Sequence, residues 1–174
     1  SLYQITSDSS SSELKDMPTI IKATREHIKR MQDRGVSYLT GQTTGFYELD
    51  KKTTGFNPGD LVIIAARPAM GKTAIVLNTA LQNIEKGDGV IFFSLEMPET
   101  QLMTRLLSIK TSIPLQNLRK GELNPNQAEQ VEKAFSDLST KKLFVDDNGS
   151  LNINQLRARA RKISQNEENN IKLI

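Results

Sequence analysis

The sequence feature that most constrains the fold is the stretch LVIIAARPAMGKTAIVL at residues 61–77. It opens with a continuous apolar run at residues 61–65, which is typical of a strand buried on both faces of a parallel sheet. A turn follows at residues 66–71. Apolar residues then recur at helical spacing: Val76, Leu77, Ala80, Leu81 and Ile84. The pattern predicts a strand, a turn and a helix in direct succession.

The turn ends in Gly71-Lys72-Thr73, and this ending predicts a phosphate-binding loop. Backbone N–H groups of the turn and of the first helical turn can point at phosphate oxygens. Gly71 lets the backbone approach closely, Lys72 places a positive charge against the β- and γ-phosphates, and the Thr73 hydroxyl can hold Mg²⁺. Ala66 stands where the usual pattern has glycine, so an ordinary turn with a surface lysine stays an alternative. The candidate nucleotide-binding residues are Ala66, Arg67, Pro68, Ala69, Met70, Gly71, Lys72, Thr73 and Ala74.

The composition excludes several other kinds of site. The 174 residues include no Cys and one His, so disulfides and thiolate metal sites are excluded and a His-based metal site or triad is disfavoured. No apolar run approaches the roughly 18 residues of a membrane span, and the N-terminus is too polar for a signal peptide, so we expect a cytoplasmic protein. A net charge of +3 permits nucleic-acid binding without requiring it.

The N-terminal part predicts a linker and a helix. Residues 1–12 are Ser-rich and indicate a flexible linker. Residues 13–34 show one apolar and one charged helical face, and Gly35 is a natural stop, so we assign residues 13–35 to a helix and residues 36–174 to a separate domain. The apolar face packs either on its own domain or on a neighbouring molecule. Between residues 36 and 60, we expect Phe46, Leu49 and Phe56 to hold a short helix on the core.

A second strand is predicted at residues 90–93, with Glu96 just after it and a helix from Pro98. In an open parallel sheet, ligands bind at the carboxyl ends of the strands. A carboxylate there can polarise a water for attack on a γ-phosphate. The alternative for Glu96 is an acid favoured by the dipole at the start of the next helix.

The rest of the chain continues the alternation of helices and strands. A helix from Pro125 should bury Ala128, Val131, Phe135 and Leu138, and a strand at residues 143–147 ends in Asp146 and Asp147. Taken alone, these two acids have two possible roles. They either support Mg²⁺ at the end of the strand or cap the turn that follows it. A helix at about residues 152–165 carries several cations, which face either solvent or nucleic acid. A last strand begins at Ile171.

Four segments together resemble the C-terminal motor domain of bacterial replicative DNA helicases of the DnaB type: TTGFYELDKKTTGFNPGDLVIIAARPAMGKT, FFSLEM, LRARARKI and IKLI. The resemblance spans about residues 13–174. It implies an α/β fold of the RecA-like P-loop NTPase class, with a mainly parallel sheet, flanking helices and a preceding linker helix. It also implies a hexameric ring around single-stranded DNA, with ATP and Mg²⁺ bound between subunits.

The same resemblance implies roles for individual residues. Lys72 matches the Walker A lysine, and Thr73 matches the Mg²⁺ ligand. Glu96 matches the catalytic glutamate. The Ala-Arg-Pro opening of the loop, which begins at Ala66, is the form that this family has. The helix at residues 13–34 matches the linker helix that packs on the adjacent subunit. Asp146 and Asp147 would be strand-end residues, because the family's Walker B aspartate follows the strand that begins near Ile171.

The implied function is an ATP-driven replicative helicase that translocates on single-stranded DNA and unwinds duplex at the fork. Primase and a helicase loader are the implied partners. The family's arginine finger and DNA-binding loops come later than residue 174, so we expect these residues alone to hydrolyse ATP weakly or not at all. Two alternatives stay open: a RecA- or RadA-like recombinase ATPase, and an adaptor that uses nucleotide as a switch without unwinding.

Overall fold

The computed structural model describes residues 14–33 and 39–174. The chain divides into two units, residues 1–37 and 38–174. The first contains helix α1 (Met17–Asp33), whose start is capped by a hydrogen bond from the Thr19 N–H to the Asp16 carboxylate at 3.3 Å. The expected linker at residues 1–12 and the stop at Gly35 lie outside the described residues. Within residues 14–33 and 39–174, no helix has the length and apolar character needed to span a membrane.

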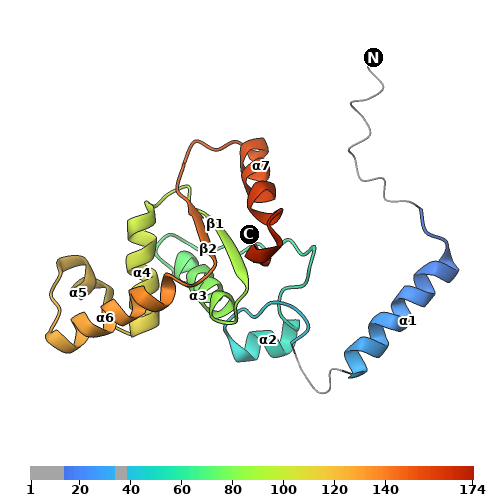
Figure 1. The fold of residues 1–174 in the computed structure, drawn as a ribbon, viewed down its shortest axis with the longest axis horizontal. Coiled ribbons are helices and arrows are strands. Elements are labelled where there is room, and N and C mark those ends of the chain that lie inside the picture. Colours follow the sequence, from blue (N-terminus) through green and yellow to red (C-terminus); the bar gives the residue numbers. More distant parts are fainter. Residues whose placement is uncertain (1–13, 34–38) are drawn as a thin grey trace, which may run out of the picture. The chain divides into compact units, whose positions relative to one another are not determined.

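The second unit is built on a parallel sheet in the order β2-β1-β3 (Figure 1). Its strands are β1 (Gly89–Phe93), β2 (Leu143–Asp146) and β3 (Ile171–Leu173). Val90 lies opposite Leu143 and Phe93 opposite Asp146, while Gly89 lies opposite Ile171 on the other side of β1. The structure therefore confirms three of the predicted strands as parallel, including the one that begins at Ile171.

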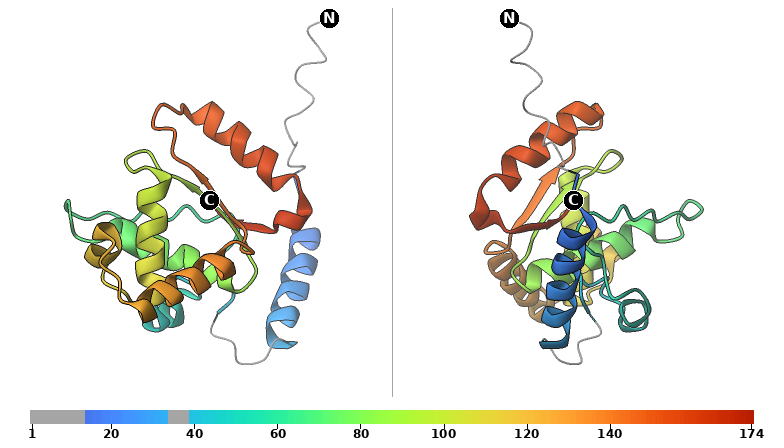
Figure 2. Two further views of the ribbon diagram at one scale, coloured as in Figure 1. Left: turned by 60° about the vertical axis from the view of Figure 1, so that its left-hand side comes forward. Right: turned by 90° about the vertical axis from the view of Figure 1, so that its right-hand side faces the viewer.

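Helical crossovers join the strands, as parallel pairing requires. The first crossover contains α4 (Glu99–Thr111), α5 (Leu115–Lys120) and α6 (Pro125–Leu138). The second contains α7 (Ile153–Ser164) and the short 3-10 helix η2 (Glu167–Asn169). Figures 1 and 2 show α4 and α7 on opposite sides of the strands, so the sheet has helices on both faces.

Helix α3 (Lys72–Glu85) lies at the centre of the core. The predicted stripe is buried at Leu77, Ala80, Leu81 and Ile84, which cluster with Val90 of β1 and with Leu102 and Leu106 of α4. Val76, which has the same helical spacing, is exposed.

Helix α6 packs on α4 in a second cluster, through Val131 and Ala134. Asn124 is its N-cap, and its side chain accepts a hydrogen bond from the Gln127 N–H at 2.8 Å. The expected burial of Ala128 and Phe135 is wrong, because both are exposed. Helical spacing gives several possible apolar faces on this helix, and the small Ala134 side chain allows α4 to approach the face that carries it.

Helix α2 (Tyr47–Thr53) is held by polar side chains and not by the aromatic residues that the sequence suggested. Phe46 and Leu49 are exposed, and Phe56 is half-buried beside Gln42 in an isolated antiparallel bridge. Buried polar residues from this segment and from α3 form what we call the polar network: Thr43, Thr44, Asp50, Thr79 and Asn83. The prediction failed because apolar spacing carries no information about a buried carboxylate.

The Asp50 carboxylate is the centre of the polar network and is only 3% exposed. It accepts hydrogen bonds from the Thr44 N–H at 2.7 Å, the Thr44 hydroxyl at 2.6 Å and the Thr43 hydroxyl. The Thr79 hydroxyl donates to the Thr44 carbonyl at 2.7 Å, and the Asn83 amide donates to the Thr43 carbonyl at 2.9 Å. The segment before the phosphate loop is therefore tied directly to α3.

The run at residues 61–65 is not the buried strand that its composition predicted. These residues are in no strand, and Ile63 is 80% exposed. Among the described residues, no strand pairs with this run. The two edges of the sheet are formed by β2 and β3. An apolar run indicates that burial would be favourable, but a strand also needs a neighbour for its N–H and C=O groups.

Candidate functional site

The start of α3 has the geometry of an anion-binding helix terminus. Gly71 is the N-cap, with φ +91° and ψ 15°, and Ala69 two residues earlier also has a positive φ of 63°. Between them the chain turns, with the Met70 N–H donating to the Arg67 carbonyl at 3.2 Å. In this described part of the chain, no side chain caps the helix and no acid lies in its first turn. Its free N–H groups and positive dipole end are therefore open to an anion.

Lys72 and Thr73 occupy the first two positions of this helix. Lys72 is exposed and Thr73 is half-buried, and none of the ion pairs among the described residues involves Lys72. The remaining predicted loop residues, 66–70 with Ala74, are exposed around them. The structure thus places an exposed cation and a hydroxyl beside the uncapped helix end.

Glu96 lies at the same end of the α3–β1 layer. Helix α3 runs into β1 through the short turn at residues 86–88, so the two elements are antiparallel and the start of α3 lies toward the end of β1. Glu96 is exposed in the loop at residues 94–98 that follows β1, and we call this segment the Glu96 loop. Chain topology therefore brings Lys72, Thr73 and Glu96 to one edge of the sheet, where ligands bind in folds of this kind.

The two acids at the end of β2 are engaged with protein groups. Arg159 of α7 donates to the Asp146 carboxylate, and this hydrogen bond holds the pKa of Asp146 below its usual value. Asp147 accepts a hydrogen bond from the Glu99 N–H at 3.1 Å. In the part of the chain that the structure describes, no three acidic, His or Cys side chains gather in a way that could hold a metal ion.

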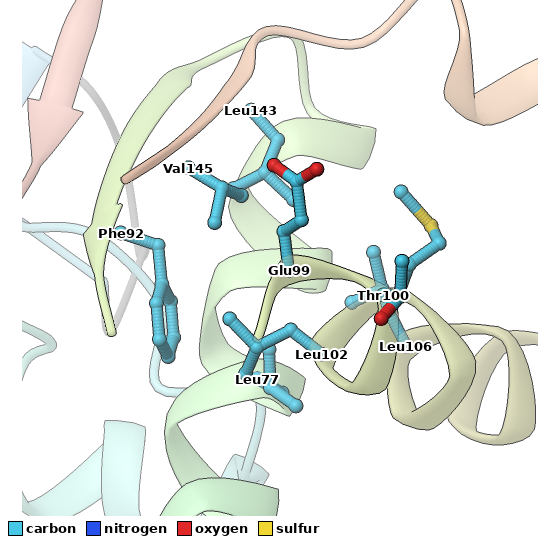
Figure 3. A pocket seen from close by; sticks show the side chains of 9 residues that line it. Leu77, Phe92, Glu99, Thr100, Leu102, Leu106, Leu143 and Val145 are labelled. Atoms are coloured by element: carbon cyan, nitrogen blue, oxygen red, sulfur yellow. The ribbon is translucent and has the colours of Figure 1, made fainter. Parts of the chain in front are cut away.

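A cavity of about 270 Å³ lies between α3, α4 and the strands β1 and β2 (Figure 3). Its lining is mostly apolar, with Leu77, Phe92 and Leu102 turned toward one another and Glu99 and Thr100 contributing the polar groups. None of Lys72, Thr73 or Glu96 lines it. The cavity is therefore a gap in the core and not the candidate site.

Sequence reasoning missed the residues that support the site. Thr79 and Asn83 are polar residues beside the apolar stripe of α3, and their spacing of four residues was a usable sign of a buried polar contact. For the bond between Asp147 and Glu99, which are 48 residues apart, the sequence carries no comparable signal.

Known proteins are similar to this chain over most of its length. Residues 41–174 match the family described as DnaB-like helicase C terminal domain. The chain is 40% identical over 174 residues to the replicative DNA helicase DnaB of Helicobacter pylori, covering 99% of this chain and 36% of that protein. It is 37% identical over 166 residues to the DnaB of Geobacillus stearothermophilus, covering 94% of this chain and again 36% of that protein. The chain thus spans about a third of the length of these curated relatives.

Two solved structures are similar in fold. One, described as an ATPase domain, aligns with a TM-score of 0.75 and 26% identity, covering 83% of this chain and 52% of that one. A DnaB-like replicative helicase, described with its interactions with primase, aligns with a TM-score of 0.73 and 25% identity, covering 94% and 39%. These neighbours confirm the RecA-like ATPase fold, and such a domain implies nucleotide use. The chain therefore belongs to the DnaB-like helicase C-terminal domain family.

Proposed function

We propose that this chain is part of the ATP-driven motor of a replicative DNA helicase, which translocates on single-stranded DNA and unwinds duplex at the replication fork. The observation that carries the proposal is the uncapped start of α3 at Gly71-Lys72-Thr73, in a chain of the DnaB-like family. The names of the relatives, replicative DNA helicases, support the reaction class.

The residues at the start of α3 fit a Mg²⁺–ATP complex. The backbone N–H groups of residues 66–74, apart from Pro68, bind phosphate oxygens, and the Lys72 ammonium pairs with the β- and γ-phosphates. The Thr73 hydroxyl would hold Mg²⁺, which when bound neutralises charge between the β- and γ-phosphates. The positive φ of Gly71 and the absence of an acid in the described first turn of α3 support this assignment.

Glu96 is the catalytic base in this proposal. Its carboxylate accepts a proton from the water that attacks the γ-phosphate, and a positioned general base contributes about 10²–10⁴ in rate. Its exposed position after β1, at the edge of the sheet where α3 begins, supports the role.

Helix α1 is the proposed contact with the next subunit of a hexameric ring. Its side chains Ile20, Ile21 and Ile28 are exposed, and an apolar helix face gains stability only by packing on another surface. Single-stranded DNA, primase and a helicase loader are the further proposed partners, and the activity belongs in the cytoplasm. Deletion of residues 14–33 should weaken assembly, and an unchanged oligomer mass by light scattering would contradict this role.

Titration with a fluorescent ATP analogue and Mg²⁺ tests the nucleotide site. We expect saturable binding that Lys72→Ala abolishes, while Lys52→Ala, which removes an exposed lysine from α2, binds like the wild type. Equal binding by the Lys72→Ala variant would overturn the site.

The intact protein distinguishes the helicase from its alternatives. A forked DNA substrate should be unwound in an ATP-dependent manner, and Glu96→Gln should abolish unwinding while ATP binding remains. Strand exchange without unwinding would instead indicate a recombinase. Nucleotide binding without DNA-stimulated turnover would indicate an adaptor.

A further inference from the structure

The end of β2 and the turn after it contact the Glu96 loop and the first residue of α4 at three separate points. The Ser94 N–H donates to the Asp146 carbonyl at 2.8 Å, and the Glu99 N–H donates to the Asp147 carboxylate at 3.1 Å. Between them, Gly149 lies so close to the Leu95 carbonyl oxygen that a Cβ on Gly149 would be 3.1 Å from it. The first residue of the Glu96 loop, the residue before Glu96 and the residue directly after the loop are therefore in contact with residues 146–149.

The Glu96 loop is also closed on itself. The hydroxyl of Ser94, a residue only 6% exposed, donates to the Met97 carbonyl at 2.6 Å and accepts from the Met97 N–H at 3.3 Å. Glu96 lies between these two residues, and its own carboxylate makes no hydrogen bond or ion pair among the described residues. Its position therefore depends on the backbone on either side of it.

Residues 146–150 form an ordered turn that holds Asp147 in place. Arg159 of α7 binds the Asp146 carboxylate, which also accepts from the Asn148 N–H at 3.2 Å. The Asn148 side chain in turn accepts from the Ser150 N–H at 3.0 Å. These contacts orient Asp147 toward the start of α4.

Asp147 supplies the cap that α4 lacks in its own sequence. The N-cap position of α4 is Pro98, which has no side chain able to accept a hydrogen bond. A carboxylate at a helix N-terminus is favoured both by the hydrogen bond and by the dipole. Because this carboxylate comes from 48 residues away, its bond joins the end of β2 to the backbone just after Glu96.

We infer that Asp147 is a positioning residue for Glu96: its hydrogen bond to the Glu99 N–H fixes the end of the Glu96 loop and so the place of the Glu96 carboxylate. The inference rests on the proposed role of Glu96 in hydrolysis. A displacement of about 1 Å in a catalytic group is enough to lower a rate substantially.

The test compares caps on two helices in the intact protein. Asp147→Ala removes the cap of α4, and Asn124→Ala removes the side-chain cap of α6, which is remote from Glu96. We expect Asp147→Ala to lower kcat about tenfold with nucleotide affinity unchanged, and Asn124→Ala to leave kcat unchanged. Asp147→Asn keeps an oxygen that accepts from the Glu99 N–H, so it should restore most of the rate.

Two further measurements separate positioning from a general loss of stability. In a Glu96→Gln background, Asp147→Ala should cause no further fall in residual turnover, since the group that it positions is gone. Hydrogen exchange of the amides at residues 95–99 should be faster in Asp147→Ala than in the wild type.

Different experimental results would contradict the positioning role of Asp147 and the proposed role of Glu96. Wild-type kcat in Asp147→Ala, or an equal fall in Asn124→Ala, would overturn the inference and leave the proposed function intact. Full turnover by Glu96→Gln would overturn the assigned role of Glu96, and the positioning role of Asp147 with it.

Discussion

The two ends of helix α3 are built in opposite ways. Its first turn and the preceding residues 61–71 are mostly exposed, with free N–H groups and an exposed lysine. From Leu77 onward, the same helix is buried by the apolar cluster on one side and bound by the polar network on the other. The comparison shows how a site can stay open to a charged ligand: a well-packed helix holds its exposed end in place.

The packed half is bound to a buried ionised group, Asp50. Burial alone raises the pKa of Asp50, but donation from Thr43 and Thr44 and the charge of Lys86 outweigh that effect and hold the pKa below its usual value. Asp50 is therefore charged at neutral pH, and its bonds contribute to the attachment of residues 43–50 to α3.

The largest expected effect comes from breaking the packed half at Asp50. Asp50→Ala leaves the Thr43 and Thr44 donors buried without an acceptor, which should lower the free energy of unfolding by about 3 kcal/mol. Asp50→Asn is the matched control and should cost about 1 kcal/mol, because its oxygen still accepts from Thr44. Urea unfolding measures both variants, and equal stability of Asp50→Ala and the wild type would contradict the role of the network.

A smaller effect is expected at the N-cap of α3, in its exposed half, from Gly71→Ala. The added Cβ meets no described atom within 4 Å, but the φ of +91° is unfavourable for alanine. We expect a loss of about 1 kcal/mol in stability and a weaker affinity for nucleotide, because the backbone must shift at the anion-binding turn. Melting curves and nucleotide titration test this, with Gly59→Ala, at φ +91° outside the loop, as the control.

The stability that the C-terminal end of α3 contributes to the fold should depend on pH. Glu85 binds Lys110 and Lys141, the latter at 3.1 Å, and these bonds hold the pKa of Glu85 below its usual value of 4.5 despite burial. A lowered folded pKa stabilises the fold above pH 4.5, and this contribution disappears as the pH falls through the folded value.

Glu85→Gln should therefore lower Tm slightly at neutral pH and not at all in strong acid. The control is Glu129→Gln, whose partner Lys133 and own side chain are both well exposed, so its effect on Tm should be negligible. A Tm difference between Glu85→Gln and the wild type that stays constant from neutral pH into strong acid would contradict this account.

The smallest effect is expected in the exposed half, from Ile63→Ser in this 174-residue chain. Ile63 is 80% exposed, so the free energy of unfolding should change by less than about 0.5 kcal/mol. If residues 61–65 instead pack as the buried strand that their composition predicted, the loss would be several times larger. Urea unfolding of this variant therefore tests the contrast between the two ends of α3.

Much of the secondary structure followed from local patterns. Apolar spacing and turn residues predicted β1, β3, α4 and α6, because strand composition and helical periodicity are properties of short segments. The same patterns failed at Ala128, Phe135 and residues 61–65, where burial depends on which neighbour covers a face.

By itself, the sequence determined the family, the strands β1, β2 and β3, most of the helices, and the Gly71-Lys72-Thr73 start of α3, since each of these depends on contiguous residues. Only the tertiary structure decided that Asp50 is buried among Thr43, Thr44 and α3, and that Asp147 caps α4. The physical reason is that these bonds join groups from separate segments. Sequence spacing can show which residues share a face, but only packing brings a donor on one element to an acceptor on another.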